Sequence, residues 1–422
     1  MGTRIGVMRT DSPVEVSTGP TAKAERIVAL DVLRGFAILG ILAVNIQSFA
    51  MIGAAYMNPS ASGRIGGSDT FVWVLTDIFF DQKFMTLFTM LFGAGIVLMT
   101  SRAEATGRAP LRLHYTRNFW LLLIGLAHAY LLWSGDILVL YAMSAFWVVW
   151  LRRLPPRTQI VLGVLVLAVA PLISMGAQLS LPQWPADDLE ALRADWAPSQ
   201  VVISEEIVAM RGGWLSQMPH RIPATLGFHT VVFLVWGIWR AGGLFLIGMA
   251  LFQLGIITGG RSRRFYARMA VLGFGLGLPL VAYGTRYNLS AGFAVEHSMF
   301  GGGVFNYWGS IAVSFGYLGL VMLVATSGWL PGLQKRLASC GQMALTNYLT
   351  QTLICTFVFY GHGLGLFETM SRLQQTGVVL AVWALQLAWS PWWMARFRFG
   401  PFEWAWRSLT YWRLQPFARP SP

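Results

Sequence analysis

The sequence predicts an all-α, polytopic integral membrane protein with about ten transmembrane helices. Only 12% of its 422 residues are charged, about half of the ~25% that is usual in soluble domains. Hydrophobic residues make up 55% of the chain, and they gather in ten stretches that approach the ~20 residues a helix needs to cross a bilayer. This composition excludes a soluble enzyme, a disordered chain and a disulfide-linked secreted scaffold.

The ten apolar stretches give the order of the predicted helices. The third and fourth are short and are joined by a tight hairpin at residues 133–136. The second and sixth exceed the thickness of a bilayer, so each is tilted, broken or extended beyond it. The stretches cover residues 28–50, 70–100, 118–134, 136–151, 159–180, 229–258, 268–287, 303–327, 340–361 and 374–394.

The basic residues indicate how the bundle is oriented. With the N-terminus in the cytoplasm, 22 of the 31 lysines and arginines fall in cytoplasmic segments, 6 in external segments and 3 within spans. This excess follows the positive-inside rule, so both termini are predicted to be cytoplasmic. The net charge of +13 then reflects topology rather than a nucleic-acid partner.

Four segments are predicted along the chain. Residues 1–25 are polar and lack apolar periodicity, which indicates a disordered cytoplasmic tail. Residues 26–180 form an N-terminal half of five spans, and residues 229–422 form a C-terminal half of five spans. Between them, residues 181–228 are acidic and carry amphipathic patterns, so they are expected to lie on the external surface.

The only cysteines, Cys340 and Cys355, both fall in the ninth stretch. On one continuous helix they would lie about 22 Å apart, too far for a disulfide. Core packing explains both thiols, and no spacing of cysteine and histidine predicts a metal site.

Charged residues within apolar stretches cost free energy and are candidates for function. Asp31 and Arg34 are three residues apart, so they share a helix face and can pair. The pair either anchors the first span at the cytoplasmic interface or leaves Arg34 to bind an anionic group such as a phosphate. Gly35 and Gly40 on the same span allow another helix to approach closely.

A second set of intramembrane charges comprises Asp77, Asp81 and Lys83, with Arg240 in the sixth stretch. Asp77 and Asp81 lie four residues apart on one helical face, where like charges repel. Either one carboxyl is protonated or both meet Lys83 or Arg240. The segment itself is either a continuous helix or a helix that breaks on the way to the outer interface.

His128 and Asp136 lie on either side of the predicted hairpin. If the two helices fold back on each other, the carboxylate can pair with the imidazole, orient it and raise its basicity. Alternatively, the histidine bonds a neighbouring helix and Asp136 serves as the N-cap of the fourth span. The sequence leaves both alternatives open.

The ninth stretch carries Asn347, Tyr348 and Gln351 among apolar residues. Hydrogen bonds between helices explain many such clusters. A polar substrate channel would use the same side chains, so the cluster does not decide between the two.

Two parts of the chain resemble a known family. Residues 26–45, with the pattern Arg-x4-Asp-x2-Arg-Gly and Asn45, resemble the first span of the YeiB-like bacterial membrane proteins and of the related heparan-α-glucosaminide N-acetyltransferases. Residues 341–351 and 397–407 look like the C-terminal DUF418 domain that defines the YeiB-like group. The hairpin around residues 128–138 also fits that group.

The resemblance implies a transmembrane acyltransferase bundle in the cytoplasmic (inner) membrane of a bacterium. It implies a cytoplasmic acyl-CoA donor, such as acetyl-CoA, and transfer of the acyl group to a sugar hydroxyl or amine on the outer side. Relatives of known activity use a histidine near the outer end of the first span. Here Asn45 is present, but no histidine occurs between it and residue 70, so His128 is the predicted replacement.

Three functions compete. In an acyltransferase, His128 would deprotonate the acceptor, Asp136 would orient the histidine, and Asn45 would stabilise the developing oxyanion. The arginines predicted to hold the CoA phosphates at the inner face are Arg34, Arg117, Arg152 and Arg153.

The first alternative is a transporter, flippase or proton-coupled channel for a small molecule or lipid. The side chains assigned to its path or to the substrate are Asp31, Asp77, Asp81, Lys83, Arg240, Asn347, Tyr348 and Gln351. The second alternative is a non-catalytic lipid- or quinone-binding protein. The expected partners are membrane lipid and a small-molecule, glycan or lipid acceptor, with a homodimer also considered and neither metal nor nucleic acid expected.

Overall fold

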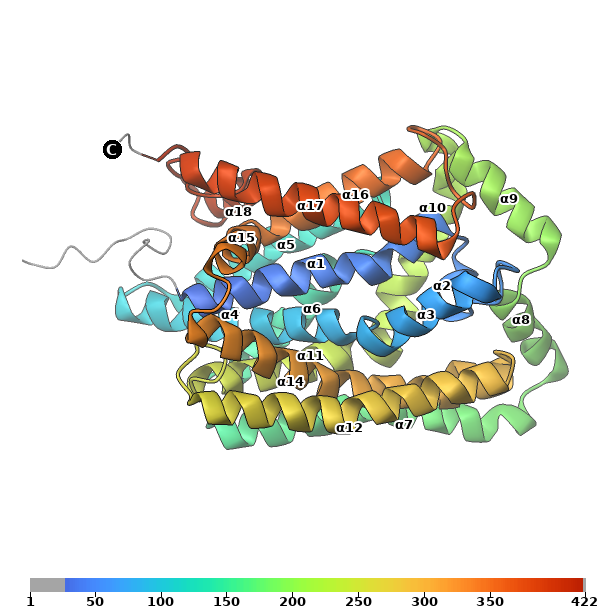
Figure 1. Cartoon of the computed structure of the whole chain (residues 1–422), viewed down its shortest axis with the longest axis horizontal. Helices are drawn as coiled ribbons and strands as arrows, with labels where there is room; N and C mark the ends of the chain where they lie inside the picture. The colour runs from blue at the N-terminus through green and yellow to red at the C-terminus, as the bar shows by residue number, and fades with distance from the viewer. Residues whose placement is uncertain (1–26, 420–422) are drawn as a thin grey trace, which may run out of the picture.

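The computed structural model describes residues 27–419 as a bundle of helices whose long members run side by side (Figure 1). Both ends of this described chain lie at one end of the bundle, here called the terminal end. The opposite end carries α8 (Ala186–Trp196) and α9 (Gln200–Arg211) and is called the insertion end. Within residues 27–419 no strand forms, and one isolated β-bridge joins Phe397 to Ala418. The predicted tail, residues 1–25, lies outside the described residues.

The helices within the two predicted halves and within the insertion differ widely in length. The N-terminal half contains α1 (Val28–Ala50), α2 (Ala54–Met57), α3 (Gly67–Phe79), α4 (Lys83–Ala105), α5 (Pro110–Leu131), α6 (Leu138–Val148) and α7 (Pro156–Ser180). The insertion adds α10 (Met218–Gly227) after α9. The rest contains a π-helix (Phe228–Gly237) that continues into α11 (Ile238–Gln253), then α12 (Arg263–Ser290), α13 (Val295–His297), α14 (Gly303–Ser327), α15 (Pro331–Gln342), α16 (Ala344–Phe359), α17 (Arg372–Arg396) and α18 (Pro401–Thr410).

Seven helical segments in the described part of the chain are long and apolar enough to cross a membrane. Two of them, the segments that contain α7 and α12, bury only 22% of their most apolar windows. Their outward faces present leucines and valines such as Leu172, Leu179, Val271 and Leu276. Because water disfavours apolar surfaces of this extent, these faces fit a hydrocarbon environment. All ten predicted stretches are helical, but α5, α6 and α16 are too short or too polar to belong to the seven.

Helix α1 occupies the core of the bundle. Most of its apolar window, 72%, is buried, and it contacts α4, α14, α15, α16 and α17. Its backbone packs closely against α15, because a Cβ on Gly35 would lie 1.9 Å from the carbonyl oxygen of Leu337. A Cβ on Gly341 of α15 would lie 1.9 Å from the carbonyl oxygen of Asp31. The predicted use of a small residue for helix approach is therefore confirmed at Gly35.

The prediction that Cys340 and Cys355 share one continuous helix is wrong. The chain breaks between α15 and α16, so the two buried thiols lie on different helices. The carboxylate of Glu403 on α18 accepts the backbone N–H groups of Leu345 at 2.6 Å and Thr346 at 3.0 Å. These are first-turn donors that α16 itself cannot satisfy, so a distant residue fixes where α16 begins.

Candidate functional site

His128 and Asp136 meet at the insertion end of α5. Nδ1 of His128 lies 2.7 Å from Oδ1 of Asp136, and the two residues are 2% and 0% exposed. The other carboxylate oxygen accepts the backbone N–H of Val139 at 2.8 Å. Asp136 therefore both pairs with the imidazole and caps the first turn of α6, so the two alternatives left open by the sequence are compatible.

The second ring nitrogen of His128 faces α16. Its Nε2 lies 2.9 Å from the hydroxyl oxygen of Thr352. Because the carboxylate of Asp136 only accepts, Nδ1 carries the hydrogen, and in the neutral imidazole Nε2 then accepts the hydroxyl hydrogen of Thr352. One turn earlier on α16, the ring of Tyr348 lies 5.2 Å from the imidazole, and its hydroxyl oxygen accepts the N–H of Ile137 at 3.4 Å.

The insertion covers the end of α5 that carries the histidine. Trp214 and Arg221 both donate to the carbonyl of Leu131, at 2.7 and 2.9 Å. Thr225 donates to the carbonyl of Ala129 at 3.3 Å. The last carbonyls of a helix have no partner within it, so these side chains complete the end of α5 and cover the nearby hairpin.

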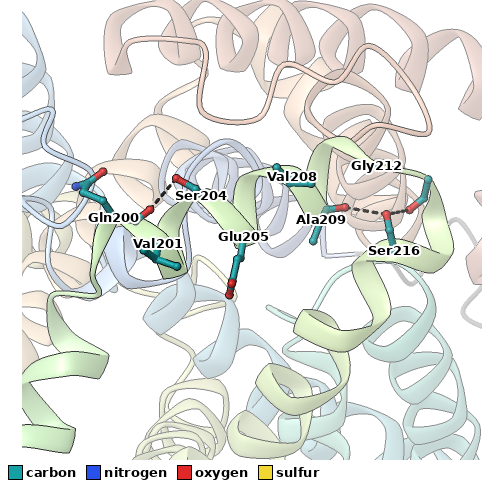
Figure 2. Close-up of a pocket in the computed structure, with 9 residues that line it drawn as sticks. Gln200, Val201, Ser204, Glu205, Val208, Ala209, Gly212 and Ser216 are labelled. Carbon is teal, nitrogen blue, oxygen red and sulfur yellow. Dashed lines mark hydrogen bonds between the residues drawn. The ribbon is translucent and has the colours of Figure 1, made fainter.

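A groove of about 810 Å³ opens on the outside of the insertion (Figure 2). The hydroxyls of Ser204 and Ser216 donate to backbone carbonyls within it, as the dashed lines in Figure 2 mark. Its wall is formed by Gln200, Val201, Ser204, Glu205, Val208, Ala209, Gly212, Gly213 and Ser216. His128 does not line this groove, but Trp214, which binds the end of α5, lies between two of the residues that do.

Positive charge accumulates at the terminal end between α1, α5 and α18. Nη1 of Arg34 pairs with Oδ1 of Asp31 at 2.9 Å, which confirms the predicted contact. The guanidinium of Arg117 stacks over the ring of Trp406 at 4.4 Å, and the positive charges of Arg407 and Arg34 both act on it. Arg34 and Arg117, two of the four arginines predicted to hold phosphate, therefore lie close enough for their charges to interact. Arg407, which was not among the four, joins them.

The other two arginines in that prediction bind an acid instead. Arg152 and Arg153 share the carboxylate oxygen Oε1 of Glu104 on α4, at 3.2 and 2.8 Å. The side chain of Arg152 is 8% exposed and that of Arg153 is 73% exposed. The structure thus divides the predicted phosphate ligands into two groups, and in one of them Arg117 contacts α18 through Trp406.

The intramembrane charges meet at a break between α3 and α4, where Gln82 has a φ of +61°. Of the two alternatives, the broken helix is the one observed. The side-chain amide of Asn306 on α14 joins the charges: its oxygen accepts from Lys83 at 2.6 Å, and its nitrogen donates to Asp81 at 2.6 Å and to Asp77 at 3.4 Å. Asn306 is a central residue that the sequence analysis missed.

Arg240 is buried beside this network, with 1% of its surface exposed. The hydrogen bonds described for it go to Thr86 and Ser310 hydroxyls, both at 2.8 Å, and to the carbonyl of Tyr307 at 3.1 Å. Its guanidinium also stacks over the ring of Tyr307 at 4.5 Å. The residue thereby ties α11 to α4 and α14.

Asn347 and Gln351 of α16 face α17 rather than the imidazole. Asn347 donates to the hydroxyl of Ser390 at 3.2 Å, and Gln351 donates to the side-chain oxygen of Gln386 at 2.9 Å. Both contacts join two helices, which favours the packing alternative for these two residues.

Asn45 is half-buried on α1, and no side-chain hydrogen bond is described for it. Three residues further along the same helix, Ser48 accepts the indole N–H of Trp133 at 3.1 Å. Asn45 therefore lies about one turn from the hairpin contact, and its catalytic role stays a prediction.

Thr352 was not among the residues predicted from the sequence. The available signal was its position four residues after Tyr348, which puts both on one helical face. A threonine in an apolar stretch is common, so this signal is weak without knowing which helix that face meets.

Comparisons with known proteins agree on the family. The model of the family described as "Protein of unknown function (DUF418)" matches residues 251–413. The chain is 34% identical to "Uncharacterized protein YeiB" of Escherichia coli (strain K12) over 400 residues, which cover 92% of this chain and 96% of that protein. It is 29% identical to "Uncharacterized protein YxaH" of Bacillus subtilis (strain 168), over 96% of this chain and 98% of that protein.

A third relative is described as "Uncharacterized 39.9 kDa protein in amylase 3'region" of Bacillus acidopullulyticus. It is 26% identical over 94% of this chain and 97% of its own length. No solved structure matches the chain. Because the sequence identity to YeiB exceeds 30% and the alignment spans nearly all of both proteins, the chain belongs to the YeiB-like DUF418 family.

Proposed function

We propose that this protein is a membrane-embedded acyltransferase. It would move an acyl group from acyl-CoA at the terminal end to an acceptor at the insertion end. The observation that carries this proposal is the buried pair of His128 and Asp136, because an imidazole oriented by a carboxylate is a general base.

The distance between the two ends of the site supports acyl-CoA as the donor. Arg117 and His128 lie on the same helix, eleven residues apart, which corresponds to about 16 Å along its axis. An extended pantetheine arm can span such a distance. The phosphates of CoA would then lie against Arg34 and Arg117, since guanidinium groups bind phosphate well, while the thioester reaches the imidazole.

The chemistry at the imidazole follows from its hydrogen bonds. The attacking hydroxyl or amine adds to the thioester carbonyl, Nε2 of His128 takes its proton, the C–S bond breaks, and the proton passes to the departing CoA sulfur. Asp136 holds the imidazole in the required tautomer. The hydroxyl of Tyr348 accepts the N–H of Ile137 and keeps its own hydrogen to donate to the developing oxyanion. Asn45 is proposed as a second donor.

The proposed topology places the terminal end in the cytoplasm of a bacterium, where acyl-CoA is made. Ten spans result when α5, α6 and α16 cross the membrane together with the seven longer segments. The acidic insertion then faces outward, and the groove of Figure 2 is the proposed place for a glycan or lipid headgroup to approach. The excess of basic residues in the segments at the terminal end supports this orientation.

The test is to incubate the purified protein in lipid nanodiscs with labelled acetyl-CoA and a panel of amino sugars, hexoses and bacterial lipids. We expect saturable CoA binding and acceptor-dependent release of the CoA thiol. His128→Ala should lower that release about 100-fold or more, whereas the exposed His297→Ala should not. Arg117→Met should raise the KM for acetyl-CoA. Wild-type protein that neither binds CoA nor consumes the thioester would contradict the proposal.

A second candidate function is proton-coupled transport. It is favoured by one observation, the broken helix that brings Asp77, Asp81 and Lys83 to Asn306, because broken helices with ionisable groups form many transport sites. Its test is pH-driven uptake into proteoliposomes, which Asp81→Asn should abolish and Asp195→Asn on the exposed face of α8 should not.

A further inference from the structure

The hydroxyl of Thr352 behaves unlike most helical threonines of this protein. A threonine within a helix usually donates to the carbonyl four residues earlier. Ten in the described helices do so, namely Thr86, Thr89, Thr100, Thr116, Thr230, Thr285, Thr326, Thr350, Thr376 and Thr410. The only hydrogen bond described for the hydroxyl of Thr352 is the one to Nε2 of His128.

This contact completes a chain of three groups from three segments. Asp136 precedes α6, His128 lies on α5 and Thr352 on α16, and the two hydrogen bonds measure 2.7 and 2.9 Å. A carboxylate, an imidazole and a hydroxyl in this order form the arrangement in which a base activates an oxygen nucleophile. When the imidazole is neutral, this hydroxyl donates to the nitrogen that would take its proton.

The surroundings of the hydroxyl suit an acyl ester. Thr352 and His128 are 1% and 2% exposed, and the rings of Trp133 and Tyr348 lie 6.1 and 5.2 Å from the imidazole. An enclosed, largely apolar site excludes water, which would otherwise hydrolyse the ester. Tyr348 lies one turn from Thr352 on the same face of α16, and its hydroxyl, which contacts the N–H of Ile137, is the proposed donor to an oxyanion formed at Thr352.

We propose that Thr352 is the first acyl acceptor and that the protein works through an acyl-threonine intermediate. This inference rests on the acyltransferase activity proposed above. In the first step, Oγ1 of Thr352 attacks the thioester carbonyl of acyl-CoA while Nε2 of His128 takes the hydroxyl proton. The new C–O bond forms, the C–S bond breaks, and the proton passes from His128 to the CoA thiolate, which leaves as the free thiol.

The second step reverses these roles. The hydroxyl or amine of the final acceptor attacks the ester carbonyl on Thr352, and Nε2 of His128 takes its proton. The ester C–O bond breaks and His128 returns a proton to Oγ1 of Thr352. The acceptor carries the acyl group away, and the three side chains recover their starting state.

The experiment uses purified full-length protein in nanodiscs with acetyl-CoA and no acceptor. We expect a burst of CoA thiol that approaches one per chain, and a mass increase of one acetyl group on the peptide that contains Thr352. Thr352→Val should abolish both, whereas Thr352→Ser should retain both. Thr350→Val removes a back-bonded hydroxyl two residues away on the same helix and should leave the burst unchanged. Thermal melting shows whether each variant folds.

The outcomes separate this inference from the proposed function. If acetyl-CoA is consumed only when an acceptor is present, no adduct forms and Thr352→Val keeps the wild-type rate, the transfer is direct and the acyl-threonine is overturned, while the acyltransferase stands. If a folded wild-type protein neither binds nor consumes acetyl-CoA or longer acyl-CoA esters under any of these conditions, the proposed function fails and the intermediate fails with it. An adduct on another residue would also overturn the assignment to Thr352.

Discussion

Asp136 reaches back across the hairpin to His128, with 2.7 Å between Oδ1 and Nδ1, while its other oxygen closes the first turn of α6. One carboxylate thus connects the geometry of the hairpin with the tautomer of the imidazole. Any movement of α6 relative to α5 would be transmitted to the proposed base.

The substitution Asp136→Asn should separate the two roles of this carboxylate, which are to cap α6 and to stabilise the imidazole. The amide oxygen of asparagine can still cap α6, but the anion that stabilises a protonated imidazole is lost. We expect release of the CoA thiol to fall about 100-fold or more, with little change in CoA affinity and melting temperature. Asp195→Asn on α8 is the control. Wild-type turnover in the Asp136 variant would refute an orienting role for this carboxylate.

Removal of the side-chain amide of Asn306 should lower the stability of the protein more than a substitution on its exposed surface does. Asn306→Ala would leave Lys83, Asp77 and Asp81 without the group that joins them. Loss of a hydrogen-bond partner from charged groups that are buried or half-buried costs about 1–3 kcal/mol. Thermal or denaturant-induced unfolding in detergent should show this loss of stability.

The matched control for that experiment is Asn288→Ala on α12, because the side-chain oxygen of Asn288 has no hydrogen-bond partner among the described residues. We expect only a small change in stability for this variant. Equal effects of the two substitutions would mean that the network around Asn306 adds nothing to the stability of the bundle.

The contact between α1 and α15 predicts that Gly341 tolerates no side chain. A Cβ there would lie 1.9 Å from the carbonyl oxygen of Asp31, so Gly341→Ala must push the two helices apart. Overpacking of this kind costs about 1–3 kcal/mol. Gly332→Ala on the same helix meets nothing within 4 Å and is the control. Similar melting temperatures for the two variants would show that the helices can separate without cost.

Local sequence was sufficient to find features whose partners lie close in the chain. His128 and Asp136 are eight residues apart and Asp31 and Arg34 three, so a hairpin or a single helical turn brings each pair together. The apolar stretches likewise found every long helix, because twenty apolar residues in a row have few alternatives to a membrane span.

Features that depend on distant partners could not be found in this way. Asn306 lies 223 residues from Lys83, and Thr352 lies 224 residues from His128. Threonine is common in apolar helices, and the sequence does not show which helices Asn306 meets, so only the packing of whole helices shows the roles of these two residues. The start of α16 is a similar case, because it is fixed by Glu403, nearly sixty residues later.

Glu403 also predicts a dependence of stability on pH. This carboxyl is 7% exposed, and its burial raises its pKa above the ordinary value of 4.5, although N–H and O–H groups of Leu345 and Thr346 favour the charged form. A carboxyl with a raised pKa in the folded state binds more protons there than in the unfolded state. Its contribution to the free energy of unfolding is therefore full below about pH 4.5 and is lost as the pH rises through the raised pKa.

The comparison of wild-type protein with Glu403→Gln isolates this effect, because all other titrating groups are shared. Glutamine can still accept from the first turn of α16 with its amide oxygen, but it does not ionise. The melting temperature of the wild type minus that of the variant should fall as the pH rises from about 4.5 through the raised pKa of Glu403. A difference that grows with pH would mean that the donors around the carboxylate outweigh its burial, and that the start of α16 is held by a stable anion.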